Sequence, residues 1–420
     1  MKKDTKGVKE NQDLKFKNGN GSHKEVMKNG LMDFVISAGL ETLHEMIDES
    51  IESLCGERYR HISEREFIRW SMKKTKIILG GKKIEIKHNR VRNFKTYQEK
   101  ALEILEYLKN EDLLRDRVFE NMTIGISTRK YKRALEANSQ SIVVSNISKS
   151  SVSRDFIVKS TAKLQEWLNE PIKDEYPFLM IDGIVFKKVT VVIALGIDRC
   201  GNKKVLGAWE GSTENARLCT DLLRNLVERK LDTSKVKLVI IDGSKALRKA
   251  VTDVLGNEIL IQRCQLHKKR NVLDYLPKEK QKSVFIAMSD AYRQEDYDTS
   301  RKLLMNLSNR LKKDFPKAST SLLEGLEETL TLVKLKAGKE IRKALCTTNP
   351  IESLNSNIKY ITKRVKRWRD DKMVIRWVCT AVIESQKNFR KINGYHQIEN
   401  LLNKLEANDK KRIDNKECVA

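Results

Sequence analysis

The sequence lacks any apolar run long enough to cross a membrane. A spanning helix needs about 20 consecutive apolar residues, and the apolar stretches here are much shorter. The chain begins Met-Lys-Lys-Asp-Thr-Lys and continues in polar sequence, so we expect no signal peptide. We therefore expect no membrane partner.

Paired cysteines and aromatic residues are also scarce. The seven cysteines are scattered and odd in number, which suits reduced thiols in a cytosol better than a disulfide framework. Aromatic residues make up 6% of the chain, whereas Leu, Ile and Lys are abundant. This composition favours a helix-rich protein with a modest sheet.

Positive charge is in excess. The 420 residues include 83 Lys and Arg against 57 Asp and Glu, a formal net charge of +26. This balance favours a polyanionic partner, and nucleic acid is the leading candidate. The length is sufficient for two or three domains that each bury a core.

The first part of the chain divides into an arm and a mainly helical region. Residues 1–30 are lysine-rich with almost no large apolar residues, which predicts a disordered basic arm. Residues 31–170 are predicted to be a mainly helical DNA-binding region. They open with an amphipathic helix over 31–60 and include a small β-hairpin over 76–88 that turns at Gly80-Gly81.

Two helix starts in this region favour a helix-turn-helix. Ser127 is placed to cap the first helix, and the second opens with serines and two cations. Small hydroxyls and cations are typical of the first turn of a recognition helix, but an ordinary capped helix with solvated charges has the same pattern. The candidate DNA-contacting residues are Arg129, Lys149, Ser150, Ser151, Ser153 and Arg154.

From residue 171 onwards the sequence predicts an α/β core. Apolar runs rich in β-branched residues predict three antiparallel strands, followed by two βα-type crossovers. The strands are expected at residues 178–184, 189–197, 204–210, 236–241 and 258–263. The predicted divisions are a mixed sheet with helices on its faces over 171–270, a helical insertion over 271–345, the resumed core over 346–395 and a tail over 396–420.

Two aspartates, each followed by glycine, stand on these strands. Asp182 interrupts an apolar run, where an unsatisfied carboxylate is costly, and Asp242 follows the fourth strand. If the two strands are parallel neighbours, both carboxylates emerge at one edge, where hard oxygen ligands bind Mg²⁺ or Mn²⁺. Two such ions support in-line phosphoryl transfer. A plain Asp-Gly turn is the alternative; it suits Asp242 well and Asp182 poorly.

A third carboxylate is expected from the block Thr347-Thr-Asn-Pro-Ile-Glu352. Asn349 as N-cap, Pro350 at the first helical position and Glu352 at the third are typical of a helix start. Glu352 then has two roles open to it, a metal ligand or the acid of a capping box.

Cationic residues lie beside these candidates. Cys264 and His267 form a Cys-x-x-His pair, which lacks a second pair for structural zinc; a strand-end thiol and a helix-start histidine are the plainer interpretation. The basic runs either line a solvated face or follow a DNA backbone into the site, and their proximity to Glu352 favours DNA. The candidates are Lys268, Lys269, Arg270, Lys359, Lys363, Arg364, Lys366 and Arg367.

These residues together resemble the Mutator-type transposases of bacterial insertion sequences. The resemblance is densest from 176 to 380. It is carried by Ile-Asp182-Gly, Val205-Leu-Gly-Ala-Trp209, Ile-Asp242-Gly, Gln262-Arg-Cys-Gln-Leu-His-Lys-Lys-Arg-Asn-Val272 and Thr347-Thr-Asn-Pro-Ile-Glu-Ser-Leu-Asn355.

The resemblance implies an RNase H-like core with a helical insertion before the final glutamate. It implies a DDE triad of Asp182, Asp242 and Glu352 that cuts and joins DNA with Mg²⁺ or Mn²⁺, with His267 as an auxiliary group. The implied partners are double-stranded DNA, both element ends and target, and a second copy of the chain, in a bacterial cytoplasm at the nucleoid. A metal-dependent nuclease of the same fold and a non-catalytic DNA-binding descendant are the alternatives.

Overall fold

The computed structural model describes residues 23–60, 62, 65–79, 82–109, 111–131, 148–211 and 215–417. The chain divides into two compact units, residues 1–118 with 126–153, and residues 119–125 with 154–420. No helix within the described ranges combines the length and apolarity that crossing a membrane requires. The cysteines in these ranges are free thiols, as their scattered positions predict.

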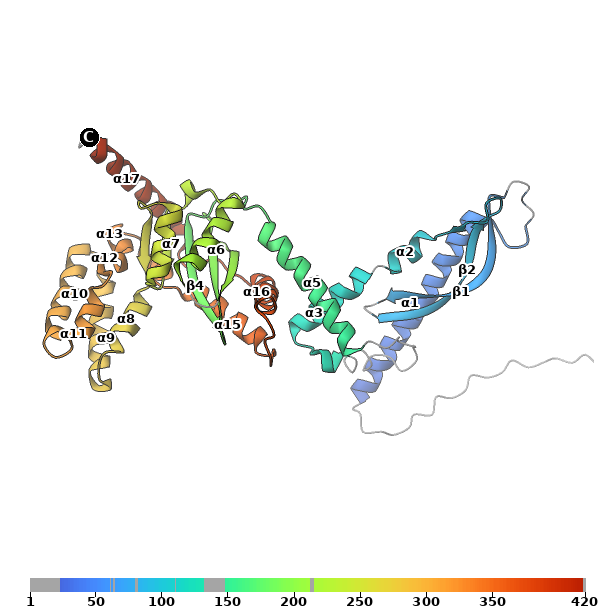
Figure 1. Ribbon diagram of the computed structural model, residues 1–420, viewed down its shortest axis with the longest axis horizontal. Helices are drawn as coiled ribbons and strands as arrows, with labels where there is room; N and C mark the ends of the chain where they lie inside the picture. Colours follow the sequence, from blue (N-terminus) through green and yellow to red (C-terminus); the bar gives the residue numbers. More distant parts are fainter. Residues whose placement is uncertain are drawn as a thin grey trace, which may run out of the picture. The chain divides into compact units, whose positions relative to one another are not determined.

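The first unit packs a long helix against a small antiparallel sheet (Figure 1). Its elements are α1 (His23–Cys55), β1 (Phe67–Leu79), β2 (Lys82–Asn93), β3 (Glu99–Lys100) and α2 (Glu103–Lys109), with strand order β1-β2-β3. Leu43, Ile47 and Ile51 recur every four residues along α1 and so form one apolar stripe. This stripe is buried against Ile77 and Ile84 of the hairpin.

Two predictions for this unit need correction. The first helix begins at His23, within the stretch predicted as a disordered arm; residues 1–22 lie outside the described ranges. The predicted hairpin is confirmed, but its strands span 13 and 12 residues, so the region carries more sheet than expected. Its turn at Gly80-Gly81 also lies outside the described residues. The predicted hairpin covers only the central part, where Ile77, Ile84 and Ile86 are buried, because the apolar residues Trp70 and Met72 in the outer part of β1 are exposed and do not alternate with buried ones.

The second unit is built on a five-stranded mixed sheet in the order β6-β5-β4-β7-β8. β4, β5 and β6 are antiparallel, whereas β7 and β8 run parallel to β4. The strands are β4 (Phe178–Phe186), β5 (Val189–Ile197), β6 (Lys203–Gly211), β7 (Leu238–Ile241) and β8 (Leu260–Arg263). All five predicted strands are therefore confirmed, with ends that differ by at most two residues.

Helices cover both faces of this sheet. On β4, Leu179 and Ile181 point to one face and Phe178 and Met180 to the other, because side chains alternate along a strand. The first face packs against α6 (Ala216–Glu228) and α7 (Lys245–Leu255). The second face packs against α15 (Asn349–Thr362), α16 (Asp371–Gln386) and the later part of α5 (Lys149–Asn169).

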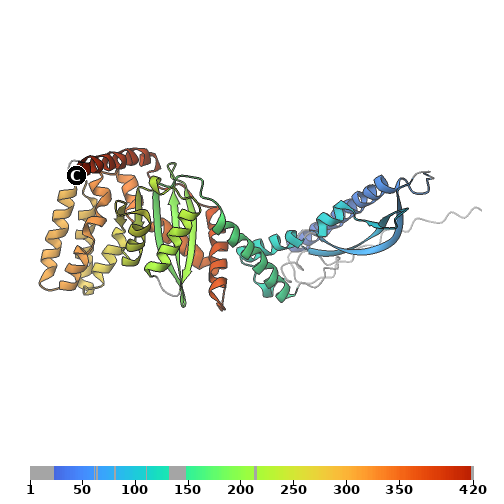
Figure 2. The ribbon, with the colours of Figure 1, turned by 45° about the horizontal axis from the view of Figure 1, so that its top comes forward.

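The stretch between β8 and α15 is wholly helical, as predicted, and has its own apolar core. Figure 2 shows these helices, yellow to orange, stacked beside the sheet. They are α8 (Gln265–Leu273), α9 (Lys278–Arg293), α10 (Tyr297–Lys312), α11 (Pro316–Leu323), α12 (Leu326–Thr329), α13 (Thr331–Lys334) and α14 (Lys339–Leu345).

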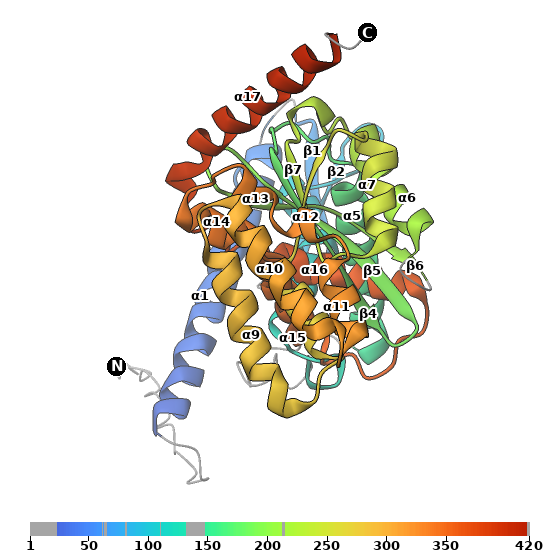
Figure 3. The ribbon, with the colours of Figure 1, turned by 90° about the vertical axis from the view of Figure 1, so that its left-hand side faces the viewer.

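The stretch predicted as a C-terminal tail is a helix, α17 (Ile398–Glu417), labelled in Figure 3. Leu401, Leu402 and Leu405 of its first turns are buried in the core beneath the sheet. The prediction of a tail was wrong because the high charge of residues 408–416 obscured this short apolar stripe.

Candidate active site

The two predicted aspartates occupy equivalent positions on neighbouring parallel strands. Ile181 of β4 is the partner of Ile241 of β7, and the next residues are Asp182 and Asp242. β7 ends at this level, whereas β4 continues to Phe186 paired with β5. The expectation that the two strands are parallel neighbours is confirmed, and it places the two aspartates at the same level of the sheet, although Asp182 lies within its strand rather than at the end.

The turn after β7 fixes the direction of Asp242. Gly243 has a φ of +105°, and a Cβ at this position would lie 1.9 Å from Arg263 Nε, so only glycine is accommodated. Asp242 Oδ1 accepts a hydrogen bond from the Ser244 backbone N–H at 2.8 Å. Asp242 is therefore a turn residue as well as a candidate ligand, and the turn orients its carboxylate.

Asp182 is a buried carboxylate with other carboxylates nearby. Its side chain is 8% exposed, and Asn355 Nδ2 of α15 donates a hydrogen bond to Oδ2 at 2.8 Å. Burial and then the neighbouring Asp242 raise the pKa of Asp182 to about 7, with a smaller contribution from Glu352. A divalent cation bound between the carboxylates would remove this cost.

Glu352 lies in the first turn of α15, but that helix does not begin as predicted. The N-cap is Thr348 rather than Asn349, and no side chain caps the helix. The Thr348 backbone N–H donates to Cys264 Sγ at 3.4 Å, so it is not bound by Glu352. Instead the Thr348 hydroxyl donates to Glu352 Oε1 at 2.8 Å. The capping-box interpretation of Glu352 is therefore wrong.

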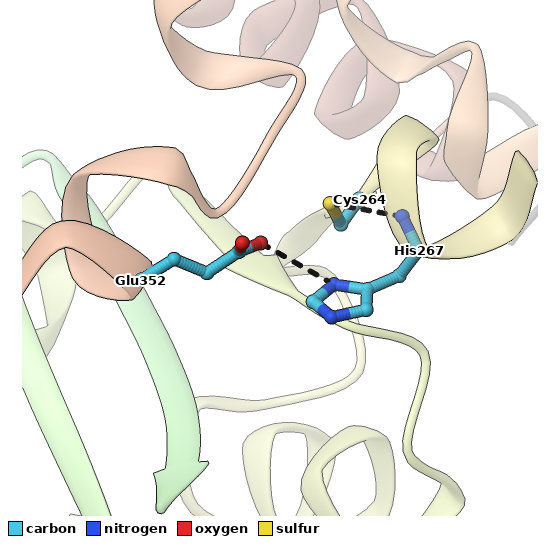
Figure 4. A group of neighbouring side chains, drawn as sticks. All are labelled: Cys264, His267 and Glu352. Carbon is cyan, nitrogen blue, oxygen red and sulfur yellow. Dashed lines mark hydrogen bonds and ion pairs between the residues drawn. The ribbon is translucent and has the colours of Figure 1, made fainter. Parts of the chain in front are cut away.

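Cys264, His267 and Glu352 lie together where α8 and α15 begin (Figure 4). Within the described residues their donor atoms are all within 4.8 Å of one another. Cys264 is the N-cap of α8, and its Sγ accepts a hydrogen bond from the His267 backbone N–H at 3.5 Å. His267 Nδ1 is 3.9 Å from Glu352 Oε1, and an Arg270 guanidinium nitrogen is 3.8 Å from Oε2.

This neighbourhood stabilises a cationic imidazole. A hydrogen bond with the Cys264 thiol raises the pKa of His267 to about 9, and Glu352 and Asp242 add to the effect against the opposing effect of burial. Burial tends to raise the pKa of Cys264, but hydrogen bonds from His267 and Thr348 outweigh it and lower that pKa. His267 is thus positively charged at neutral pH and lies beside the carboxylates.

The two lysines that follow His267 both contact the helices after α8, and one of them is fully buried. Lys268 is 1% exposed, and its ammonium donates to the carbonyls of Ser321, at 2.6 Å, and Glu324. Lys269 Nζ donates to Ser289 Oγ at 3.2 Å and lies 4.8 Å from the Phe285 ring centroid. Both therefore hold α8 to the insertion, and the prediction of DNA contact is wrong for Lys268. Arg270 is exposed.

The basic residues after Glu352 are only partly on its helix. Lys359 is exposed on α15, whereas that helix ends at Thr362, so the later cations lie on the loop before α16. Arg364 donates to the Thr123 carbonyl at 3.0 Å and is half-buried. The remaining exposed candidates on the loop are Lys363, Lys366 and Arg367.

Only part of the predicted helix-turn-helix lies within the described residues. Ser127 caps the next turn by accepting from the Lys130 N–H at 3.3 Å, and Arg129 is exposed. Residues 132–147, which include the last four residues of the predicted first helix and the linker, lie outside the described ranges, so the motif stays a prediction. The second helix, α5, is confirmed. Lys149, Ser150 and Arg154 are exposed in its first turns, and Ser151 and Ser153 are half-buried.

The hairpin of the first unit carries a group of exposed lysines that could not be recognised as one surface from the sequence. Lys74, Lys76 and Lys87 are exposed, and pairing places Lys74 opposite Lys87 and Lys76 opposite Glu85. Nearby, the Arg92 guanidinium lies 3.2 Å from the centroid of the Trp70 ring, which is 48% exposed. Exposed lysines among apolar strand residues were the available signal, and only the register shows that they share one face.

Comparison with known proteins matches the chain to one protein family, over a range that includes all the candidate site residues. The family model described as "Transposase, Mutator family" matches residues 8–392. The chain is 26% identical over 384 residues to the transposase for insertion sequence element ISRM5 of Rhizobium meliloti (strain 1021), covering 89% of this chain and 92% of that protein. It is 28% identical over 279 residues to the transposase for insertion sequence element IS256 in transposon Tn4001 of Staphylococcus aureus, covering 62% and 67%. It is 33% identical over 198 residues to the transposase for insertion sequence element IS6120 of Mycolicibacterium smegmatis, covering 46% and 60%. The chain belongs to the Mutator family of transposases.

Proposed function

We propose that the chain is a DDE transposase in which Asp182, Asp242 and Glu352 hold two Mg²⁺ or Mn²⁺ ions. The observation that carries this proposal is the pair of aspartates at equivalent positions on β4 and β7, one buried with a pKa raised to about 7. The strand order, three antiparallel strands followed by two parallel ones, supports an RNase H-like core. The helical stretch between β8 and α15 supports the predicted insertion.

The donor set suits a hard divalent cation. Carboxylate oxygens are the ligands that Mg²⁺ prefers, with water and phosphate oxygens completing the shell. Bound there, the ions would supply Lewis acidity to the scissile phosphate and lower the pKa of the attacking group. The chain itself orients Asp242 through Ser244 and Asp182 through Asn355. Cationic His267 and Arg270 lie beside the carboxylates, where a phosphate oxygen carries negative charge.

The chemistry consists of two phosphoryl transfers. In the first, water attacks a phosphodiester at the element end, a P–O bond breaks, and the products are a 3′-hydroxyl and a 5′-phosphate. In the second, that 3′-hydroxyl attacks a target phosphodiester, a new P–O bond forms, and a target 3′-hydroxyl leaves. No net oxidation or reduction occurs in either step.

The partners in this proposal are the terminal inverted repeats of the element and a target duplex, bound by a homodimer in the bacterial cytoplasm. Arg129, the first turns of α5, Lys359 and the loop after α15 supply exposed cations for the DNA backbone. Pairing two ends requires two copies of the site, so dimerisation on DNA is part of the proposal.

The test uses purified protein, DNA carrying the element ends, and Mg²⁺ or Mn²⁺. We expect metal-dependent nicking and strand joining by the wild type, and loss of both in Glu352→Gln with unchanged DNA affinity. Glu384→Gln is the matched control, because Glu384 lies on α16 and forms an ion pair with Lys387 at the end of that helix. Cleavage without joining would support the nuclease alternative. Equal activity of wild type and Glu352→Gln would refute the triad, and DNA binding without cleavage by the wild type would support the non-catalytic alternative.

A further inference from the structure

Thr348 is held at the centre of the site by its backbone. The residue is completely buried, and it joins α14 to α15. Its N–H donates to Cys264 Sγ at 3.4 Å, and its carbonyl accepts from the Glu352 N–H at 2.8 Å. The hydroxyl is therefore fixed in position relative to both helix starts.

Three functional groups surround this hydroxyl. Thr348 Oγ1 lies 2.8 Å from Glu352 Oε1, 3.3 Å from His267 Nδ1 and 3.4 Å from Cys264 Sγ. One hydroxyl has one proton, and the shortest contact is to a carboxylate, where a charge-assisted hydrogen bond is strongest. The proton therefore goes to Glu352, and the oxygen lone pairs face the His267 ring N–H.

The hydroxyl separates two groups that would otherwise pair. The 3.9 Å between His267 Nδ1 and Glu352 Oε1 is too long for a hydrogen bond. Arg270 is at a similar distance from the other oxygen of Glu352. Without the hydroxyl, the Glu352 carboxylate is free to rotate towards either cation and to leave its present orientation.

We propose that Thr348 is a positioning residue that orients the Glu352 carboxylate for metal binding. This inference rests on the proposed metal role of Glu352. It also gives the Cys-x-x-His pair a function: Cys264 anchors the Thr348 backbone, and His267 donates to the Thr348 hydroxyl. The pair then supports the triad instead of forming half of a zinc site.

The test compares two substitutions of the same residue. Thr348→Val is nearly isosteric and removes the hydroxyl, whereas Thr348→Ser retains it. The measurements are the single-turnover nicking rate against Mg²⁺ concentration, Mn²⁺ binding by the full chain, and affinity for element-end DNA. Removal of a group that orients a metal ligand costs about 10- to 100-fold in metal affinity or activity. We expect such a loss in Thr348→Val, recovery in Thr348→Ser, and unchanged DNA affinity in both.

The neighbouring threonine provides a matched control. Thr347 Oγ1 is buried and has no hydrogen-bond partner among the described residues, so Thr347→Val should leave the Mg²⁺ dependence unchanged. Thermal unfolding shows whether each variant is folded. Wild-type Mg²⁺ dependence in folded Thr348→Val, or equal losses in the Val and Ser variants, would overturn the inference while leaving the triad intact. A wild type that neither binds Mn²⁺ nor nicks DNA would overturn the triad and this inference with it.

Discussion

The pKa of Asp182 predicts that the native residue destabilises the fold at neutral pH. A group whose pKa is raised in the folded state binds its proton more tightly there than in the unfolded chain. The contribution of Asp182 to the free energy of unfolding is therefore fully present below pH 3.8, the pKa in the unfolded chain, and is lost as the pH rises to about 7, the pKa in the folded chain. Above that pH, folding holds an ionised carboxylate in a buried site beside Asp242. Asp182→Asn removes this charge with almost no change of shape.

The expected magnitude follows from the shift. From 3.8 to about 7 is roughly three pKa units, and each unit corresponds to about 1.4 kcal/mol, so the destabilisation above pH 7 is on the order of 4 kcal/mol. The new amide at position 182 also has a hydrogen-bond partner in Asn355. Asn355 Oδ1 is buried and has no hydrogen-bond partner among the described residues, so it can accept a hydrogen bond from the new amide once the Asn355 amide group rotates by half a turn. We therefore expect Asp182→Asn to be more stable than the wild type by a few kcal/mol at pH 8, and by little at pH 4.

Urea unfolding at pH 4 and pH 8 measures this difference, with the exposed Asp314→Asn as the control for a lost surface charge. Added Mg²⁺ at pH 8 should stabilise the wild type and leave the stability of Asp182→Asn almost unchanged, since only the wild type has a carboxylate at this position to bind the ion. The variant should also lose nicking activity. A variant less stable than the wild type at both pH values would refute the reasoning, because it would show that the carboxylate is satisfied within the fold.

Two further predictions separate DNA binding from structural roles. Replacing Lys74, Lys76 and Lys87 with Glu should weaken binding of the full chain to duplex DNA. It should also reduce the slope of log affinity against log salt by about 0.9 for each phosphate that the variant no longer neutralises; an unchanged slope would exclude the hairpin as a DNA-binding surface. Lys268→Met should lower the free energy of unfolding by about 1–3 kcal/mol for each carbonyl that is deprived of its donor and leave DNA affinity unchanged; reduced affinity in the folded variant would return Lys268 to the DNA-binding set. The control for the hairpin variant replaces three exposed lysines of α9 with Glu in the same way: Lys278, Lys280 and Lys282.

The sheet and its aspartates could be predicted because each depends on local sequence. Strands buried on both faces give continuous apolar runs, and Asp182 is conspicuous within one. The N-cap of α15 could not be predicted, because Asn349 and Thr348 are both good capping residues and the choice depends on Cys264. The hydrogen bond from the Thr348 N–H to Cys264 Sγ joins residues that are 84 positions apart in the sequence.

Burial of cations was equally hidden from the sequence. The run from Lys268 to Arg270 appears as one basic patch, but a helix turns by about 100° per residue, so its three side chains point in different directions. Lys268 enters the insertion, Lys269 packs on α9, and Arg270 remains exposed at the site. Which side of α8 is covered depends on the fold of the residues that follow it.

The same hydrogen bonds explain how a long helical insertion coexists with a precise site. The chain leaves the sheet at Cys264 and returns at Thr348, where the two points are bonded to each other. The Gln265 N–H also donates to the Cys346 carbonyl at 2.9 Å. Gln262 and Gln265 both donate to the Thr329 carbonyl, which fixes α12 against the end of β8. Because the insertion is closed at its base, the position of Glu352 relative to the aspartates depends on these few bonds rather than on the outer helices of the insertion. Changes in the outer helices should therefore affect activity less than changes at Cys264 or Thr348.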